Sequence, residues 1–334
     1  MKKIFPFILI ALGLPCATAL AASATGDIVY ETTSPYHHIR VWDNADGDRI
    51  LLFDDTWESK MNLKDPSTGQ FEYTEYFHLV WLWNQQIKSV LMLGLGGGST
   101  QRTFGHYYPD VKFETVEIDP VVAQVAKDYF HYTLSDRQKL DVLDGRMFLR
   151  GAKDKYDAIL LDAYTQGRYG ASIPPHLVTK EFFQLVRDHL NPNGVMAYNV
   201  ISTLREWNTD IVSAMFKTMK EVFPQVYAFQ AKSSLNVVLI ATTSANKTDL
   251  PALRDLAQKL IDAKKLTLPG IMDRVNALQP PPNYQSAPVL TDDFAPIESL
   301  MYTPGATAKA ATAPPAAAGN ATVKPAASTT PAKN

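Results

Sequence analysis

Cysteine is almost absent from this sequence. The 334 residues contain a single cysteine, Cys16, which lies in an N-terminal segment that we expect to be removed. Without a thiol, the rest of the chain can form no disulfide, no cysteine nucleophile and no thiolate-bound metal site. This suits an oxidising compartment.

The chain has no large surplus of either charge, and it lacks the motifs typical of a metal site, a serine nucleophile or a P-loop. The formal net charge is −2, so bulk charge gives no indication of nucleic acid. The seven histidines show no metal-ligand spacing, and we expect no metal. No serine and histidine are placed for nucleophilic attack, and no lysine follows the glycines at 94–98, which excludes a P-loop. The 46% apolar content is enough for the core of one or two domains.

The N-terminus has the pattern of a secretory signal peptide. MKK is followed by an apolar run of about 17 residues with two prolines, and then by Ala19-Leu20-Ala21. A membrane anchor is the alternative, but a bilayer span needs roughly 20 apolar residues. A lipoprotein anchored through Cys16 is less favoured because Pro15 precedes it. We predict that residues 1–22 are cleaved, that the protein is exported to the periplasm or secreted, and that no stable membrane span remains.

The C-terminus has the composition of a disordered tail. Residues 303–334 contain no acidic or aromatic residue and one branched aliphatic, Val323. Such an Ala/Pro/Thr-rich segment cannot bury a core, so we expect the folded part to end near residue 302.

Two patterns divide the chain between these ends. Residues 27–78 are β-rich, with a predicted hairpin formed by 37–44 and 49–55 and helical spacing from 71 to 83, which indicates a small N-terminal β-domain at 23–80. Residues 81–302 then alternate between strands and helices, which predicts an α/β domain with a mostly parallel sheet covered by helices on both faces. The predicted strands are 89–95, 112–119, 139–144, 156–164, 194–200 and 236–242, and the predicted helices include 120–130 and 179–190, capped by Asp119 and Thr179.

Glycines and acidic residues that could bind a ligand lie at the ends of the first four predicted strands of the α/β domain. Ligands bind at the carboxyl ends of strands in such sheets. Gly94, Gly96 and Gly98 let a backbone approach a ligand closely, and Glu117, about 20 residues later, suits two ribose hydroxyls. The alternatives are a glycine turn used for packing and an acid that caps a helix. The spacing favours a nucleotide-type ligand.

The third and fourth strand ends carry further acids. Asp144-Gly145 offers a carboxylate to an adenine amino group. Asp162 ends an apolar strand, where a carboxylate is costly unless it is used or paired. Helix capping is again the alternative, but we expect Asp162 to face the reactive end of the ligand.

These stretches resemble the spermidine synthase (polyamine aminopropyltransferase) family over about residues 27–301. The resemblance implies a methyltransferase-like Rossmann fold behind a small β-domain. It also implies transfer of an aminopropyl group from decarboxylated S-adenosylmethionine, a co-substrate rather than a bound cofactor, to a putrescine-like amine, with release of methylthioadenosine. Family members are commonly dimers or tetramers, so the resemblance suggests a homo-oligomer such as a homodimer. The matching stretches are 49-RILLFDD-55, 73-YTEYF-77, 90-VLMLGLGGGS-99, 115-TVEID-119, 144-DGRMFL-149, 158-AILLDAY-164 and 290-LTDDFAPIE-298.

The resemblance assigns site residues in two halves. The adenosine half is intact: Gly94, Gly96, Gly98, Glu117, Asp144 and Gly145 would bind the donor, and Asp162 would be the catalytic acid that accepts the amine's proton. The amine half would be formed by His37, Tyr73, Glu75, Tyr164 and Asp292. It departs from the family pattern, which has aspartates where this chain has Gly97 and Thr165, glutamine at His37 and histidine at Thr74.

These departures remove carboxylates that would hold a cationic amine. Glu75, Asp292 and Asp293 are the acids that we expect to compensate. Two other functions stay open: a different S-adenosylmethionine-dependent methyltransferase, or a non-catalytic protein that binds a nucleoside or a polyamine.

Overall fold

The computed structural model describes residues 26–167, 170–202 and 210–301, so the predicted signal peptide and tail lie outside the described residues. Its N-terminal part is a four-stranded antiparallel sheet with the strand order β1-β2-β3-β4. The predicted hairpin is confirmed, since β2 pairs antiparallel with β3. The strands are β1 (Gly26–Thr33), β2 (His38–Asn44), β3 (Asp48–Phe53) and β4 (Thr56–Asn62).

The predicted helical segment is η1 (Glu72–Leu82), an eleven-residue 3-10 helix. It is buried along most of its length, from Tyr76 to Leu82. It connects the N-terminal sheet with the larger sheet and places Tyr73 in its first turn.

The central sheet has eight strands in the order β14-β12-β13-β11-β8-β5-β6-β7. The run from β11 to β7 is parallel, whereas β13 pairs antiparallel with β11 and with β12. The predicted strand 236–242 is therefore correct in place and opposite in direction to its neighbours. Strand order reverses between β5 and β8, which is the point where open α/β sheets bind ligands. The bounds are β5 (Ser89–Leu93), β6 (Lys112–Glu117), β7 (Gln138–Val142), β8 (Tyr156–Leu161), β11 (Leu190–Ile201), β12 (Gln225–Gln230), β13 (Asn236–Thr242) and β14 (Leu278–Gln279).

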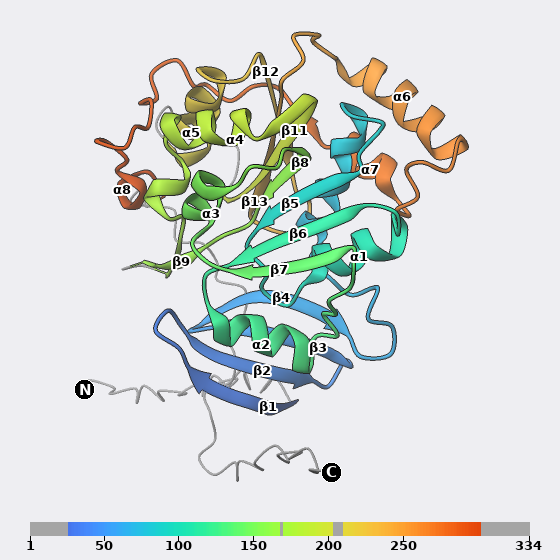
Figure 1. Cartoon of the computed structure of the whole chain (residues 1–334), viewed down its shortest axis with the longest axis vertical. Helices are drawn as coiled ribbons and strands as arrows, with labels where there is room; N and C mark the ends of the chain where they lie inside the picture. Colours follow the sequence, from blue (N-terminus) through green and yellow to red (C-terminus); the bar gives the residue numbers. More distant parts are fainter. Residues whose placement is uncertain (1–25, 168–169, 203–209, 302–334) are drawn as a thin grey trace, which may run out of the picture.

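Helices cover both faces of this sheet, as predicted (Figure 1). One core contains α3 (Gly145–Gly151), α4 (Lys180–Asp188), α5 (Ile211–Lys220) and α8 (Ile297–Met301). The other contains η1, α1 (Ser99–Tyr107), α6 (Leu250–Asp262) and α7 (Ile271–Val275). The short elements β9 (Thr165–Gly167), β10 (Gly170–Ser172) and η2 (Pro175–Leu177) follow β8 in the chain, and β9 pairs antiparallel with β10.

Helix α2 (Pro120–Tyr129) joins the two sheets. Its N-cap is Asp119, whose side chain accepts from the Val121 backbone NH, as predicted. Apolar side chains of α2 and of β2 to β4 form one buried cluster, and Figure 1 shows α2 against the N-terminal sheet. The N-terminal sheet is therefore held directly beside the carboxyl ends of β5 and β6.

Among the described residues, no helix is long and apolar enough to cross a bilayer. The same residues contain no group of three or more His, Cys, Asp or Glu side chains that could hold a metal ion.

Candidate functional site

The glycine loop after β5 lies against the end of β8. Gly94 has a φ of 104°, and a Cβ there would lie 2.1 Å from the carbonyl oxygen of Asp162. Any side chain at this position would separate the loop from the strand end. Gly96 and Gly98 also have positive φ values, 53° and 73°, so the loop turns into α1 by conformations that suit glycine.

Glu117 at the end of β6 shapes this loop. Its Oε2 accepts from the Leu95 NH at 2.9 Å, and its Oε1 accepts from the Asp119 NH at 2.9 Å. Burial raises the pKa of the Glu117 carboxyl, and the backbone hydrogen bonds oppose that rise. Each carboxylate oxygen keeps further acceptor capacity, as the predicted ribose contact requires.

Asp144 lies at the start of α3. One oxygen accepts from the Met147 NH at 2.8 Å, and the other lies 2.8 Å from Nε2 of His176. The hydrogen bond with His176 holds the pKa of Asp144 below its usual range. Asp144 therefore caps a helix, where the alternative interpretation is an ordinary turn, but two acceptor oxygens allow both capping and ligand binding. Gly145 packs on β5, because a Cβ there would lie 2.9 Å from Leu93 Cδ1.

Exposed apolar side chains lie close to these acids in the sequence. Ile118 is 40% exposed, Leu143 47% and Met147 53%. They follow Glu117 and flank Asp144 in the sequence, and the Leu143 NH donates to the Glu117 carbonyl at 3.0 Å. An apolar surface next to a carboxylate fits a flat ring with an amino group, such as adenine. The sequence prediction missed these residues.

Asp162 stands at the carboxyl end of β8, between donors from two elements. The Tyr73 hydroxyl donates to Oδ2 at 3.1 Å, and Nδ2 of Asn199 donates to Oδ1 at 2.9 Å. Burial raises the pKa of Asp162 to about 6, and the two hydrogen bonds limit the rise. A carboxyl with such a pKa can accept a proton near neutral pH.

Tyr73 and Tyr164 border this carboxylate, and both are fixed. Burial raises the pKa of the Tyr73 phenol well above its usual value, so it stays a neutral donor to Asp162. The Tyr164 hydroxyl donates to the Asn199 carbonyl at 2.8 Å and accepts from the Ile201 NH at 2.8 Å. Asp162, Tyr73 and Tyr164, which the sequence predicts for one site, are thus brought together.

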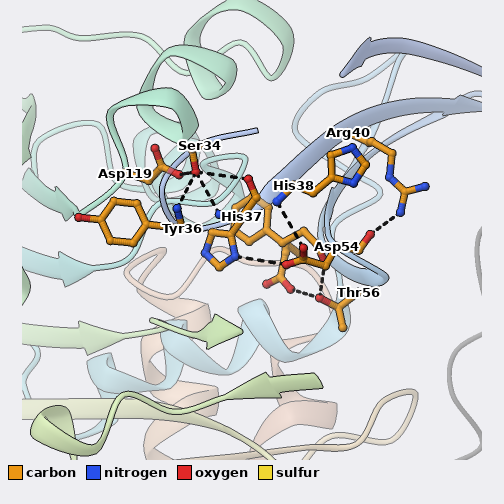
Figure 2. A network of polar contacts seen from close by, with 10 residues as sticks. Ser34, Tyr36, His37, His38, Arg40, Asp54, Thr56 and Asp119 are labelled. Atoms are coloured by element: carbon orange, nitrogen blue, oxygen red, sulfur yellow. Dashed lines mark hydrogen bonds and ion pairs between the residues drawn. The ribbon is translucent and has the colours of Figure 1, made fainter. Parts of the chain in front are cut away.

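His37 lies at the edge of the N-terminal sheet in a polar network (Figure 2). Its ring stacks on Phe53 with centroids 4.3 Å apart, and its Nδ1 lies 3.6 Å from Oδ2 of Asp54. Burial lowers the pKa of His37, and the charge of Asp54 opposes this. Ser34 connects the network to the α/β domain, because its hydroxyl donates to Asp119.

Glu75 and Asp292, the other two predicted amine-binding residues, are held in ion pairs. Arg274 of α7 lies 2.8 Å from Glu75. Arg146 forms two hydrogen bonds with Asp292 at 2.6 and 2.7 Å, and Thr179 adds a third at 2.7 Å. The hydrogen bond from Arg146 lowers the pKa of Asp292 to about 2. Amine binding by Glu75 and Asp292 stays a prediction. Their ion pairs do not favour it, because each carboxylate already has an arginine partner.

Three further residues at the site were missed. Asn199 is 1% exposed and interrupts the apolar strand 194–200, which is a signal that the sequence contained. Ser59 of β4 accepts from the Gly97 NH at 2.8 Å. Its neighbour Glu58 lies within electrostatic range of Asp162. Ser59 and Glu58 gave no signal, because their proximity depends on how the two sheets pack.

A hollow of about 530 Å³ elsewhere contains none of the predicted site residues. Its lining includes Gln101, Val111, His131, Arg137 and Gln138. It lies at the amino ends of β6 and β7, opposite the end where open α/β sheets bind ligands. The candidate site is therefore the one predicted from the sequence, at Asp162 and the glycine loop.

Comparisons with known proteins show which sequences this chain is similar to. The polyamine aminopropyltransferase of Vibrio vulnificus is 29% identical over 282 residues, which covers 82% of this chain and 91% of that protein. The eEF1A lysine and N-terminal methyltransferase of Xenopus laevis is 34% identical over 190 residues, covering 55% of this chain but 27% of that protein.

The comparisons also support the fold and the family. A crystal structure of a probable spermidine synthase from Corynebacterium glutamicum superposes with a TM-score of 0.58 at 21% identity, covering 69% of this chain and 87% of that one. This likeness confirms the predicted Rossmann-type fold with its N-terminal antiparallel sheet. The spermine/spermidine synthase domain matches residues 70–247, more than half of the chain. The protein belongs to the spermine/spermidine synthase family.

Proposed function

We propose that the protein is an aminopropyltransferase, which transfers an aminopropyl group from decarboxylated S-adenosylmethionine to an amine and releases methylthioadenosine. The observation that carries the proposal is the Asp162 carboxylate, oriented by Tyr73 and Asn199 beside the glycine loop. Its pKa, raised by burial to about 6, suits a group that accepts a proton near neutral pH.

The donor's adenosine would lie across the glycine loop. Glu117 would accept from the ribose hydroxyls, and Asp144 from the adenine amino group. Ile118, Leu143 and Met147 would cover the faces of the ring. The aminopropyl chain would then extend towards Asp162, Tyr73 and Tyr164.

The reaction needs a positioned amine and a proton acceptor. The lone pair of a neutral amine attacks the aminopropyl carbon bonded to the sulfonium. The new C–N bond forms as the C–S bond breaks, and the bond pair returns to sulfur to give a neutral thioether, methylthioadenosine. The amine nitrogen then loses its proton to Asp162. Because the sulfonium is a good leaving group, positioning supplies most of the acceleration.

A methyltransferase is the second candidate. It is favoured by the likeness to the eEF1A methyltransferase over 55% of this chain. The donor separates the two candidates, since a methyltransferase uses S-adenosylmethionine with its carboxylate intact. A protein that binds a nucleoside without turnover is the third.

The test is release of methylthioadenosine by the purified protein given decarboxylated S-adenosylmethionine and a panel of amines. Release with at least one amine, lost in Asp162→Asn, supports the proposal. Methylthioadenosine should still bind the variant, measured by calorimetry. Consumption of intact S-adenosylmethionine instead would favour the methyltransferase, and no turnover with either donor would favour the binding protein.

We also propose that the protein is exported and acts as a homo-oligomer. The basic start, apolar run and Ala-Leu-Ala site of residues 1–22 support export. Cell fractionation with mass determination of the mature N-terminus tests it: a cytoplasmic, full-length protein would contradict export. Light scattering of the mature protein tests the oligomer.

A further inference from the structure

Glu58 occupies an irregular position in the N-terminal sheet. In the pairing of β3 with β4, Leu51 lies opposite Ser59 and Leu52 lies opposite Trp57, so Glu58 has no partner on β3. It is the extra residue of a β-bulge. Bulges change the direction of a side chain and are over-represented next to active sites.

The bulge lies where β4 meets the α/β domain. The next residue, Ser59, accepts from the Gly97 NH of the glycine loop at 2.8 Å. On the other side, Trp57 stacks on Phe71 and Phe71 on Tyr73, the tyrosine that donates to Asp162. Glu58 is therefore between two contacts that lead into the candidate site.

The Glu58 carboxylate interacts with the charges of the site. Its Oε1 accepts from the Thr56 hydroxyl at 2.6 Å. Burial raises the pKa of Glu58 to about 7, and the nearby charges of Asp162 and Asp54 contribute. The charge of Glu58 in turn helps to raise the pKa values of Tyr73 and Tyr164.

Among the described residues, no cation forms an ion pair with Glu58 or Asp162. In the described part of the chain, the hydrogen-bond donors to the two carboxylates are Thr56, Tyr73 and Asn199, which are all neutral. Two nearby carboxylates that are partly buried are costly unless protonated or matched by a positive charge. The pair therefore favours a bound cation.

The glycine loop has no room for a carboxylate of its own. A Cβ at Gly97 would lie 2.9 Å from the Phe130 ring and 2.9 Å from Ser59 Cβ. A second acid instead lies near Asp162 on the side of the site formed by β4, where Glu58 is within electrostatic range of it. Resting on the proposed function, we propose that Glu58 is a specificity-determining residue: with Asp162 it selects acceptors that carry a second ammonium group beside the attacking amine.

The first test compares two acceptors with equal carbon chains, 1,4-diaminobutane and butylamine. The wild type should prefer the diamine in kcat/KM. Glu58→Gln keeps the size of the side chain and should reduce that preference at least about tenfold, with the KM for the donor changed less than twofold. Glu31→Gln, an exposed acid of the same sheet, should leave the preference unchanged. An unchanged preference in Glu58→Gln would overturn the proposal.

The second test needs no turnover, so it separates this proposal from the proposed function. 1,4-Diaminobutane is titrated into the wild type and the Glu58 variants by calorimetry, with and without methylthioadenosine. Glu58→Gln should weaken diamine binding at least about tenfold. Glu58→Asp keeps the charge, shortens its reach and should bind with intermediate affinity. Equal affinities, or no diamine binding by the wild type, would overturn the proposal. No turnover with any amine, beside Glu58-dependent diamine binding, would instead refute the transfer reaction alone.

Discussion

At the residue scale, Asp162 combines a chemical use with a cost in stability. Its pKa is raised from 3.8 to about 6, so the folded protein binds this proton more tightly than the unfolded chain does. Stability is therefore lost as pH rises from about 4 to about 6, and the loss stays at higher pH.

Asp162→Asn should make the protein more stable above pH 7. Asparagine keeps the shape and can accept from Asn199, but it carries no buried charge. We expect a gain of about 1–3 kcal/mol at pH 8 and almost none at pH 4, measured by urea unfolding. A loss of stability at pH 8 would show that interactions in the fold stabilise the ionised Asp162 carboxylate by more than its burial costs.

Tyr73→Phe should change the pH dependence of turnover. The rate depends on an ionised Asp162, so it should rise with pH through about 6. The Tyr73 hydrogen bond favours the ionised form, and its removal should move this limb to higher pH. The measurement is kcat against pH, with Tyr36→Phe, an exposed tyrosine, as the control. If the rise of kcat with pH occurs at the same pH in Tyr73→Phe as in the wild type, a group other than Asp162 controls it.

Gly97→Asp tests why the loop lacks the family's acid. Because a Cβ there meets Phe130 and Ser59, we expect a loss of about 1–3 kcal/mol of stability and no tighter diamine binding. Gly151→Asp is the control, since a Cβ at Gly151 meets nothing within 4 Å. Tighter binding in Gly97→Asp would mean that the loop can carry an acid after all.

At this scale, the sequence predicted the strand-end residues better than their partners. Asp162 and Glu117 were found because strand ends meet at one edge of a parallel sheet. Glu75 and Asp292 were assigned from family motifs alone, and the pattern gave no sign that Arg274 and Arg146 pair with them. Glu58 has no local signature, because only the packing of β4 on the glycine loop brings it to the site.

At the scale of elements, Asp292 connects the last described segment to the α/β core. Its carboxylate joins Arg146 of α3 to Thr179, the N-cap of α4. Asp292→Asn should lower stability at pH 7 by about 1 kcal/mol or less, since the pair is partly exposed to solvent.

The pH dependence of this contribution is opposite to that of Asp162. The depressed pKa of Asp292 means that its stabilisation is present above about pH 4 and is lost as pH falls towards 2. The difference between Asp292→Asn and the wild type should vanish there, with Asp293→Asn as the neighbouring control. A raised KM for the amine in Asp292→Asn, without loss of stability, would restore its predicted role in binding.

Element positions were predicted better than strand directions. Local periodicity locates β5, β8 and β11, because their apolar runs are largely buried. The antiparallel direction of β13 could not be predicted from the sequence. It depends on the pairing of β13 with β12, a strand that the sequence pattern did not reveal. The bulge in β4 was also missed, because one extra residue leaves little trace in an already irregular stretch.

At the scale of the whole molecule, the candidate site combines residues from two sheets. Glu58 and Ser59 come from the N-terminal sheet, whereas Asp162 and the glycine loop come from the central one. The two are joined through the apolar cluster that β2 to β4 share with α2, including Val125 and Phe130. A site built in this way keeps its geometry only while that cluster stays packed.

We therefore expect the two sheets to unfold together. Scanning calorimetry of the full chain should show a single unfolding transition for residues 26–301. Its calorimetric and van't Hoff enthalpies should be equal. Val125→Ala removes buried apolar surface from the shared cluster and should cost about 2 kcal/mol, moving that single transition down by about 4–8 °C. Val29→Ala, an exposed residue of β1, is the control. If Val125→Ala instead produced two transitions, the N-terminal sheet would be an independently folding part, and methylthioadenosine, by binding across both, should merge the two transitions again.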